Sequence, residues 1–355
     1  MGVGSSLLQM LRRSLLLAFL LASSAAPQAT TTATTAEQWR VVAIPFTSSQ
    51  AYANPFLDVS FTAVFTQGNR SITRAGYWNG GRAFALRFHG PALGAWAWRT
   101  QCSNPADAGL HNVSGTLQVV PYASGANPLF VHGPLRVRGD GRRFQHADGT
   151  PFRWLGDTAW MSPDLTLLDS CNAPPNVTCA SALDYIIADR LAKSFTVYQT
   201  YFFGETDTWW VPGSNYTALN ATAFEARVDR VVSAATEAGL AVALGMGMHS
   251  QSVTMPLPAL QALAAYTSAR YGAHSIVWIT AQEGAWRQRV RALCISKPHS
   301  RCTITHTART HTHTLAIPLP PACPRAQSTP PTPTPLPGRW RRARCTRAAR
   351  GCRCR

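Results

Sequence analysis

The residues best suited to chemistry lie in the middle of the chain, each shortly after an apolar segment. They are three acids, a histidine and three tryptophans: Asp157, Glu205, Glu283, His249, Trp160, Trp209 and Trp210. Carboxyl groups can exchange a proton with a glycosidic oxygen, and aromatic rings present flat apolar faces on which sugars can stack. This combination predicts a carbohydrate site in which these side chains contact the substrate.

Several of these residues also have a structural interpretation. Asp157 either binds a substrate hydroxyl or fixes the turn after its strand, and Glu205 and His249 either contact substrate or form hydrogen bonds within their loops. Trp209 and Trp210 lie in a loop that also carries Gly and Asp, which favours a substrate platform. Four acids in helical segments are interpreted as solvated: Asp184, Asp189, Asp229 and Glu237.

The segments that position these residues alternate between the periods of a strand and of a helix. Strands are expected to end at Asp157 and to cover Phe195–Tyr198, Leu240–Leu244 and Ser275–Ile279. Helices are expected around Leu183–Leu191, Phe224–Ala235 and Leu257–Arg270, with Asn220 capping the second and Gly239 just past its end. The order β-α-β-α-β-α-β predicts parallel strands joined by helical crossovers.

Two folds fit that order, a doubly wound sheet and a (β/α)8 TIM barrel. No Gly-X-Gly-X-X-Gly or Walker-type loop follows the first strand, so nucleotide binding has no motif to support it. The polar and aromatic residues follow the carboxyl ends of the strands, which is where barrel enzymes place their sites.

The preceding segment, residues 36–125, alternates with period 2. Val59, Phe61 and Phe65 occupy one face of an expected strand, and Asn79-Gly80-Gly81 predicts a hairpin because a type I′ turn needs two successive positive φ angles. Short strands without a helical stretch predict a β-sandwich of immunoglobulin type. Its aromatic residues are interpreted as core, with a sugar-binding surface as the alternative.

The net charge of +17 is confined to the end of the chain. Residues 287–355 contain 15 Lys and Arg and no Asp or Glu, whereas residues 27–286 contain 16 residues of each sign. This tail shows no period of 2 or 3.6 running through it, so no packed element is expected. It is interpreted as non-native sequence or as a disordered Pro/Arg/Cys-rich tail. Metal binding is a weaker alternative because the spacings match no zinc pattern, and would involve His306, His311, His313, Cys345, Cys352 and Cys354. With Trp340 as its only aromatic residue, the tail does not favour a nucleic-acid partner.

The start of the chain predicts secretion. Arg12 and Arg13 precede an apolar run, and residues 22–26 form a small-residue cleavage zone, so residues 1–26 are expected to be a signal peptide and not a membrane span. In that compartment Cys171 and Cys179 could form a disulfide. Five sequons are candidate glycosylation sites: Asn69, Asn112, Asn176, Asn215 and Asn220.

Three segments resemble a known family. Phe152-Arg-Trp-Leu-Gly-Asp-Thr-Ala-Trp160, residues 190–199 and Ile276-Val-Trp-Ile-Thr-Ala-Gln-Glu283 resemble the apiosidase-like glycoside hydrolase barrel. Residues 52–59 and 77–80 resemble the immunoglobulin-like domain often fused before it. The resemblance implies a polysaccharide-cleaving enzyme without metal or cofactor. It also implies a retaining site, with Glu283 as general acid/base and a second carboxylate after strand seven as nucleophile.

The chain supplies no counterpart for that nucleophile, because no Asp or Glu follows Glu283. Residues 132–286 also accommodate only about the first four βα units, since a whole barrel needs roughly 250 residues. The fold class expected is therefore α/β, an N-terminal β-sandwich followed by part of a TIM barrel. The function expected is a secreted glycoside hydrolase-like protein, inactive or impaired as written. The alternative is a secreted carbohydrate-binding protein without catalysis.

Overall fold

The computed structural model describes residues 34–279, except 161, 164, 172–173, 175–176, 202–205 and 246–254, together with residues 303–308 and 311–316. The chain divides into two units, Met1–Ile317 and Pro318–Arg355, and every described residue lies in the first. None of the described helices is long and apolar enough to cross a membrane.

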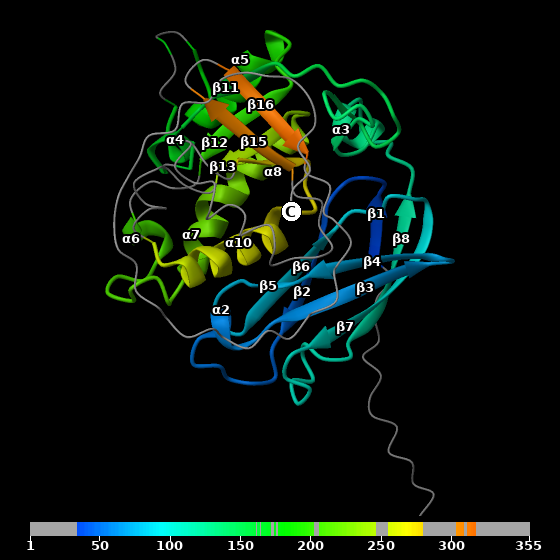
Figure 1. The fold of residues 1–355 in the computed structure, drawn as a ribbon, viewed down its shortest axis with the longest axis vertical. Helices are drawn as coiled ribbons and strands as arrows, with labels where there is room; N and C mark the ends of the chain where they lie inside the picture. The colour runs from blue at the N-terminus through cyan, green and yellow to red at the C-terminus, as the bar shows by residue number, and fades with distance from the viewer. Residues whose placement is uncertain are drawn as a thin grey trace, which may run out of the picture. The chain divides into compact units, whose positions relative to one another are not determined.

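The first part of the described chain forms two β-sheets (Figure 1). One sheet has the order β1-β8-β7-β3-β4, from β1 (Thr34–Glu37), β3 (Phe61–Gln67), β4 (Arg70–Ala75), β7 (Gly94–Cys102) and β8 (Ser114–Val120). The other has the order β2-β6-β5, from β2 (Val42–Thr47), β5 (Tyr77–Trp78) and β6 (Ala83–Phe88), and a short helix, α2 (Pro55–Asp58), follows β2.

Alternating side chains of the two sheets share one hydrophobic core. Phe61 and Phe65 of β3 and Trp96 and Trp98 of β7 are buried together with Phe88 of β6. This confirms that the aromatic residues form a core. The predicted hairpin is also confirmed, because β5 pairs with β6 and Gly80 and Gly81 have φ angles of 98° and 52°.

A four-stranded parallel sheet follows, in the order β11-β12-β13-β14. Its strands are β11 (Gly156–Thr158), β12 (Val197–Tyr201), β13 (Ala241–Gly245) and β14 (Ile276–Ile279). The connecting helices are α4 (Leu165–Asp169), α5 (Ala182–Ala192), α6 (Thr206–Trp209), α7 (Ala221–Ala223), the π-helical turn η1 (Phe224–Asp229), α8 (Arg230–Glu237) and α10 (Leu257–Tyr271). Before this sheet lie α3 (Pro128–Val131) and a hairpin of β9 (Arg136–Val137) and β10 (Phe144–Gln145).

Local signals explain where these helices begin and end. The Asn220 side chain accepts a hydrogen bond from the backbone N–H of Ala223, and Ser181 likewise caps α5 through Asp184. Gly239 follows α8 with a φ of 99°, which favours glycine. The first parallel strand, β11, covers Gly156–Thr158 and so ends one residue beyond Asp157, where its end is expected. The apolar segment Phe152–Leu155 precedes it.

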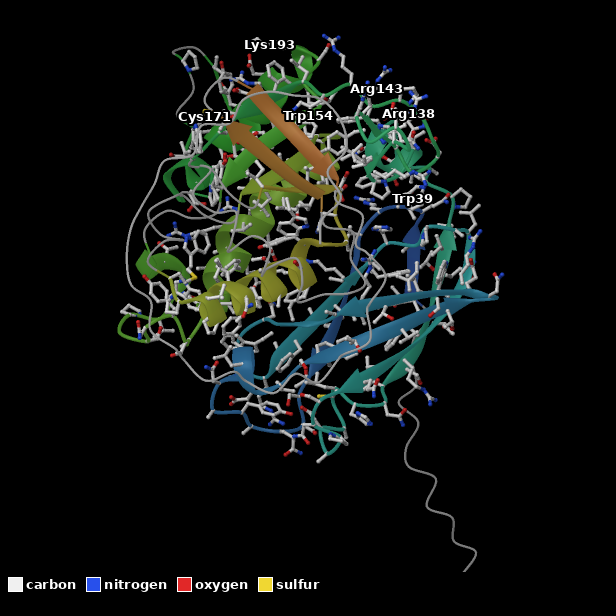
Figure 2. All side chains as sticks on the ribbon, viewed as in Figure 1. Trp39, Arg138, Arg143, Trp154, Cys171 and Lys193 are labelled. Carbon is white, nitrogen blue, oxygen red and sulfur yellow. A yellow bond between two sulfur atoms is a disulfide. The ribbon has the colours of Figure 1, made fainter. Side chains whose placement is uncertain are left out.

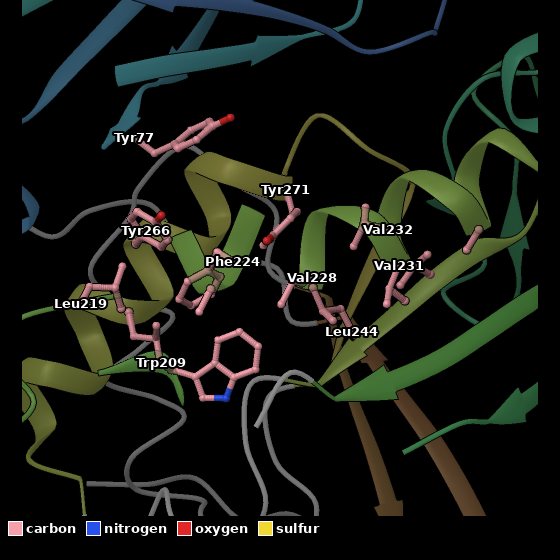
Figure 3. Packing of buried hydrophobic residues seen from close by; sticks show 14 of the residues in the cluster. Tyr77, Trp209, Leu219, Phe224, Val228, Val231, Val232, Leu244, Tyr266 and Tyr271 are labelled. Atoms are coloured by element: carbon pink, nitrogen blue, oxygen red, sulfur yellow. The ribbon is translucent and has the colours of Figure 1, made fainter. Parts of the chain in front are cut away.

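The register of the parallel sheet divides its side chains between two faces. Tyr198, Val242 and Leu244 pack with α8 and α10 in the largest core cluster, part of which is shown in Figure 3. Val197, Tyr201, Ala243 and Ile279 form a separate cluster on the opposite face, as expected for side chains that alternate along a strand. The helices therefore cover one face of the sheet, and the side chains of Val197, Tyr201, Ala243 and Ile279 lie on the other face.

A buried ionic cluster joins this helical layer to the first part of the chain. Asp229 of η1 accepts hydrogen bonds from Arg87 Nη2 of β6 at 2.5 Å and from Arg270 Nε and Nη2 of α10, both at 2.8 Å. Burial on its own would raise the pKa of Asp229, but Arg270 and Arg87 outweigh burial and hold that pKa below its ordinary value. The prediction that Asp229 is solvated is wrong, because its partners come from distant parts of the sequence.

The other three helix acids have local or exposed partners. Glu237 pairs with Arg40 at 2.8 Å, Asp189 pairs with Lys193, and Asp184 accepts from Ser181.

Further along the chain, β15 (Thr303–Ala308) and β16 (His311–Ala316) form an antiparallel pair, where no element is expected from the sequence. The Thr-rich alternation of these two segments suits β-strands.

His89, directly after β6, predicts an acid-dependent loss of stability. It is buried, and burial, with a smaller contribution from the charge of Arg74, lowers its pKa to about 4 although its Nδ1 bonds to the Ala273 carbonyl. Histidine in the unfolded chain has a pKa near 6.5. Between that pH and about pH 4 the unfolded state therefore binds a proton that folded His89 does not bind. His89 alone should lower stability by about 1.4 kcal/mol per pH unit from about pH 6.5 to about pH 4, and the buried His274, whose pKa is lowered to about 3, adds a slope of the same sign.

Chemical denaturation across that pH range tests the prediction. His89→Gln keeps a side-chain donor for Ala273 but does not titrate, so its stability should depend less steeply on pH. Equal slopes for wild type and His89→Gln would contradict the assignment.

Candidate functional site

The carboxyl ends of β11 and β12 bring two aromatic side chains together. Trp160, just after β11, stacks on Tyr201, the last residue of β12, with ring centroids 4.7 Å apart and an angle of 11° between the rings. Trp160 is 39% exposed, whereas Tyr201 is 2% exposed. The exposed ring therefore rests on a buried one, an arrangement that fixes a flat apolar surface at the end of the sheet.

Gly245, the last residue of β13, makes room for this stack. Tyr201 pairs with Gly245 in the sheet register, and a Cβ atom on Gly245 would overlap the Tyr201 ring. Burial raises the pKa of Tyr201, so the phenol stays neutral near neutral pH. Tyr201 was not among the predicted site residues. The alternation of Val197, Gln199 and Tyr201 along β12 is the signal that places Tyr201 on the face of the sheet opposite to Tyr198 and the helices.

Asp157 does not belong to this surface. It pairs with Tyr198 in the register and so shares the face that the helices cover. Its side chain bonds to Arg190 Nε of α5 and accepts the backbone N–H of Thr158 at 2.8 Å. The hydrogen bond to Asp157 is the main cause that raises the pKa of Arg190. Of the two interpretations, the geometry favours the structural one.

Trp209 and Trp210 are also poorly placed to form a platform. They are 2% and 3% exposed and belong to the largest core cluster. Trp209 packs on Phe224 (Figure 3), and Trp210 packs on Phe56. The composition of their loop favours a substrate platform, but their rings are buried against Phe224 and Phe56 and present no exposed face to a substrate. Only Trp160 of the three predicted tryptophans offers an exposed face.

The remaining predicted site residues, Glu205, His249 and Glu283, lie outside the described residues. Each follows the carboxyl end of a strand, β12, β13 and β14 respectively. Parallel neighbouring strands present their carboxyl ends at one edge of a sheet, so β11, β12, β13 and β14 end at the same edge, which Trp160 follows. No group of three or more metal-ligating side chains occurs in the described part of the chain.

The predicted modification sites vary in accessibility. Cys171 and Cys179 are joined by a disulfide (Figure 2 labels Cys171), and Cys102 is a buried free cysteine. Asn69, Asn112 and Asn215 are exposed, and Asn176 lies outside the described residues. Asn220 is half-buried, and both ends of its amide are engaged, by Ala223 N–H and by the Thr208 carbonyl. A glycan on Asn220 would therefore disrupt the cap of α7.

Comparison with known proteins places this site in a family. Residues 138–316 match the family described as "Apiosidase-like, catalytic domain", and residues 35–103 match a domain of unknown function, DUF5060. The first match covers half of the 355-residue chain. None of the curated proteins compared with the chain matches it.

Three solved structures share parts of its fold. A candidate glycoside hydrolase from Bacteroides vulgatus is 15% identical with a TM-score of 0.60, and the match covers 77% of this chain and 56% of that one. A protein described as a glycoside hydrolase is 19% identical, with 49% and 40% of the chains covered and a TM-score of 0.38. A glycoside hydrolase family 5 protein from Bacteroides vulgatus is 18% identical, with 50% and 38% covered and a TM-score of 0.37.

At these identities only the first structure is informative, and it shows likeness of fold alone. The chain spans little more than half of that structure's length. The family match, in contrast, covers the parallel sheet, the aromatic stack of Trp160 on Tyr201 and the segment that contains Glu283. This chain belongs to the apiosidase-like catalytic domain family.

Proposed function

We propose that the protein is a secreted, glycoside hydrolase-like member of this family and that its site binds carbohydrate. The observation that carries the proposal is the exposed Trp160 ring, fixed on Tyr201 at the carboxyl edge of the sheet from which Glu283 follows. A rigid aromatic face suits the apolar face of a sugar ring, and a carboxyl group suits proton transfer at its glycosidic oxygen.

Strand order supports a partial TIM barrel as the scaffold. Each strand of β11-β12-β13-β14 is parallel to its neighbour and adjacent to the next strand in sequence. A doubly wound sheet reverses its strand order at a switch point, and these four strands show no reversal. Residues 132–286 then supply about four of eight βα units. The shared core of the two preceding sheets supports a β-sandwich over residues 36–125.

In this proposal Glu283 is the general acid/base. Its carboxyl proton would pass to the glycosidic oxygen as the bond to the sugar breaks, and the resulting carboxylate would later take a proton from the attacking water. The retaining reaction also needs a second carboxylate as nucleophile, about 5 Å from the first. No Asp or Glu follows Glu283 in this chain, so we expect the chain as written to be inactive or severely impaired.

Release of reducing sugar from plant polysaccharides and from aryl glycosides tests this expectation. Wild type and Glu283→Gln should both show only background turnover, because neither has the downstream nucleophile. Clear turnover by wild type that Glu283→Gln abolishes would contradict the predicted impairment and would require a nucleophile elsewhere in the chain. Asp157→Asn is the matched control, since Asp157 pairs with Arg190 on the helical side of the sheet.

The second candidate function is carbohydrate binding without catalysis. The missing nucleophile favours it, while the Trp160–Tyr201 stack serves either function. Glycan binding with the same affinity in wild type and Glu283→Gln, without turnover in either, is the result that this alternative predicts.

Secretion is part of the proposal. The signal-like residues 1–26, the disulfide between Cys171 and Cys179, and the exposure of Asn69, Asn112 and Asn215 support it.

A further inference from the structure

A cavity lies apart from the Trp160–Tyr201 stack, between the first part of the chain and the segment that follows β12. Its volume is about 450 Å³, within the range of roughly 300–1,000 Å³ that is usual for small-ligand sites. Tyr52, Asn54, Trp78 and Arg82 line one part of it, and Val211 and Leu219 line the other.

The aromatic side chains of the cavity are held in place. Trp78 donates from Nε1 to the Gly81 carbonyl at 2.9 Å, and its own carbonyl accepts from Tyr266 at 3.1 Å. The Tyr52 hydroxyl donates to Asp107 at 2.9 Å and accepts from Asn104 at 3.1 Å. Because both rings are anchored at their polar atoms, their apolar faces are preorganised, which lowers the entropy lost on binding.

The polar groups of the cavity are mainly donors and amides. Arg82 is exposed and uses Nε to bind the Ser48 carbonyl at 2.9 Å, and within the described residues its two terminal nitrogens have no hydrogen-bond partner. The Asn54 amide donates to the Thr217 carbonyl at 2.7 Å and so ties the two walls together. Among the described residues no carboxylate lines the cavity, so its chemistry does not favour a metal ion or a cationic ligand.

An apolar patch completes the cavity. Phe84 and Leu219 are buried at its base, whereas Val211 is 46% exposed on the facing wall. Rigid aromatic rings, an apolar base and a few donors of fixed position are the features by which proteins recognise neutral or acidic sugars, whose rings have one apolar face and a hydroxylated edge.

Topology connects this cavity to the carboxyl edge of the parallel sheet. Val211 and Leu219 belong to the connection between β12 and α7, which starts at that edge beside Tyr201. Tyr52, Trp78 and Arg82 come from the region of residues 35–103 that matches DUF5060. The cavity is therefore shared between the second βα connection and the preceding domain.

We propose that this cavity is a sugar-binding subsite that holds a distal unit of an oligosaccharide whose other end lies on Trp160. The inference rests on the proposed function, since it takes the ligand at the carboxyl edge to be a carbohydrate. It gives the DUF5060 region a role in choosing the length of the glycan. Tyr52 and Trp78 contact the sugar ring, and Arg82 donates to its hydroxyl or carboxylate oxygens.

The test uses the full secreted chain and a microarray of plant and microbial oligosaccharides, followed by titration of the tightest-binding hexasaccharide and the corresponding disaccharide. Ala53→Trp fills the cavity from its exposed rim, and Arg82→Gln removes its charged donor. Each should weaken hexasaccharide binding at least about tenfold while changing disaccharide binding little. Trp154→Ala is the matched control, because Trp154 (labelled in Figure 2) is exposed and stacks on Phe144 of β10, outside the lining of the cavity.

Thermal unfolding confirms that each variant is folded. Unchanged hexasaccharide affinity in both Ala53→Trp and Arg82→Gln would overturn the inference, as would the absence of any bound glycan. The proposed function has a separate readout, Trp160→Ala, which should weaken both oligosaccharides. If Trp160→Ala changes nothing while the cavity variants lose binding, the cavity binds sugar, but the site at the carboxyl edge and the proposed span from Trp160 to the cavity are both wrong.

Discussion

Replacing Asp229 by Asn should lower the free energy of unfolding by about 3–5 kcal/mol. The Asp229 carboxylate is the only charged partner that the structure gives, within the described residues, to Arg270, whose side chain is 1% exposed, and to Arg87, whose side chain is 11% exposed. The neutral amide would leave two buried guanidinium groups uncompensated between β6 and α10. Burial of Arg270 on its own would lower its pKa, but Asp229 and the neighbouring tyrosines hold that pKa above its ordinary value in the native protein. An arginine guanidinium stays protonated in proteins, so the variant cannot relieve the buried charge by deprotonation.

The interaction of Asp229 with Arg87 and Arg270 also predicts how stability changes in acid. Because the pKa of Asp229 is lowered by folding, its contribution is present above the unfolded value of about 3.9 and is lost as the pH falls below it. Denaturant titrations at neutral pH measure the effect of Asp229→Asn. The matched control is Asp169→Asn, whose pair with Arg230 is largely exposed and should contribute less than about 1 kcal/mol. Equal losses in the two variants would contradict a buried role for Asp229.

Adding a single methyl group at Gly245 should destabilise the fold by about 1–3 kcal/mol and displace the aromatic stack. The added Cβ would overlap the Tyr201 ring, and Tyr201 is buried between β13 and Trp160, so the ring cannot move without disturbing Trp160. Denaturant titration measures the stability, and near-ultraviolet circular dichroism measures the loss of the stacked rings.

Two comparisons make this prediction specific. Gly139→Ala introduces the same methyl group at a position with no neighbouring atom within 4 Å and should leave stability unchanged. In a Tyr201→Ala background, Gly245→Ala should have little further effect, because the ring that it would displace is absent. A full effect of Gly245→Ala in that background would show that the steric conflict lies elsewhere.

The elements of the parallel sheet were largely predictable from the sequence, because each is defined by local pattern. The Asn220 cap, Gly239 and the periodic apolar stripe define the second helix within a few residues, and Asn79-Gly80-Gly81 defines the first hairpin. The position of β11 was less accessible. Phe152–Leu155 has the apolar composition of a strand, but pairing with β12 begins only at Gly156.

The functional surface was less predictable, because it depends on which face each residue occupies. Asp157 and Trp160 are three residues apart, yet the register directs Asp157 toward Arg190 and the helical layer while Trp160 stacks on Tyr201. Trp209 and Trp210 stand in a polar segment but are buried by Phe224 and Phe56, contacts that bring together residues distant in the chain. Asp229 is the same case for charge, since Arg87 lies 142 positions away.

The most direct test of the proposed function is glycan binding by the full chain, measured by titration with oligosaccharides selected on a microarray. The carbohydrate site at the carboxyl edge predicts specific binding that Trp160→Ala weakens at least about tenfold, since the exposed ring is the face on which the sugar rests. Trp154→Ala, which removes an equally exposed ring elsewhere, should bind as wild type does. Absence of glycan binding, or binding that Trp160→Ala and Trp154→Ala leave equally unchanged, would contradict a carbohydrate site at this edge.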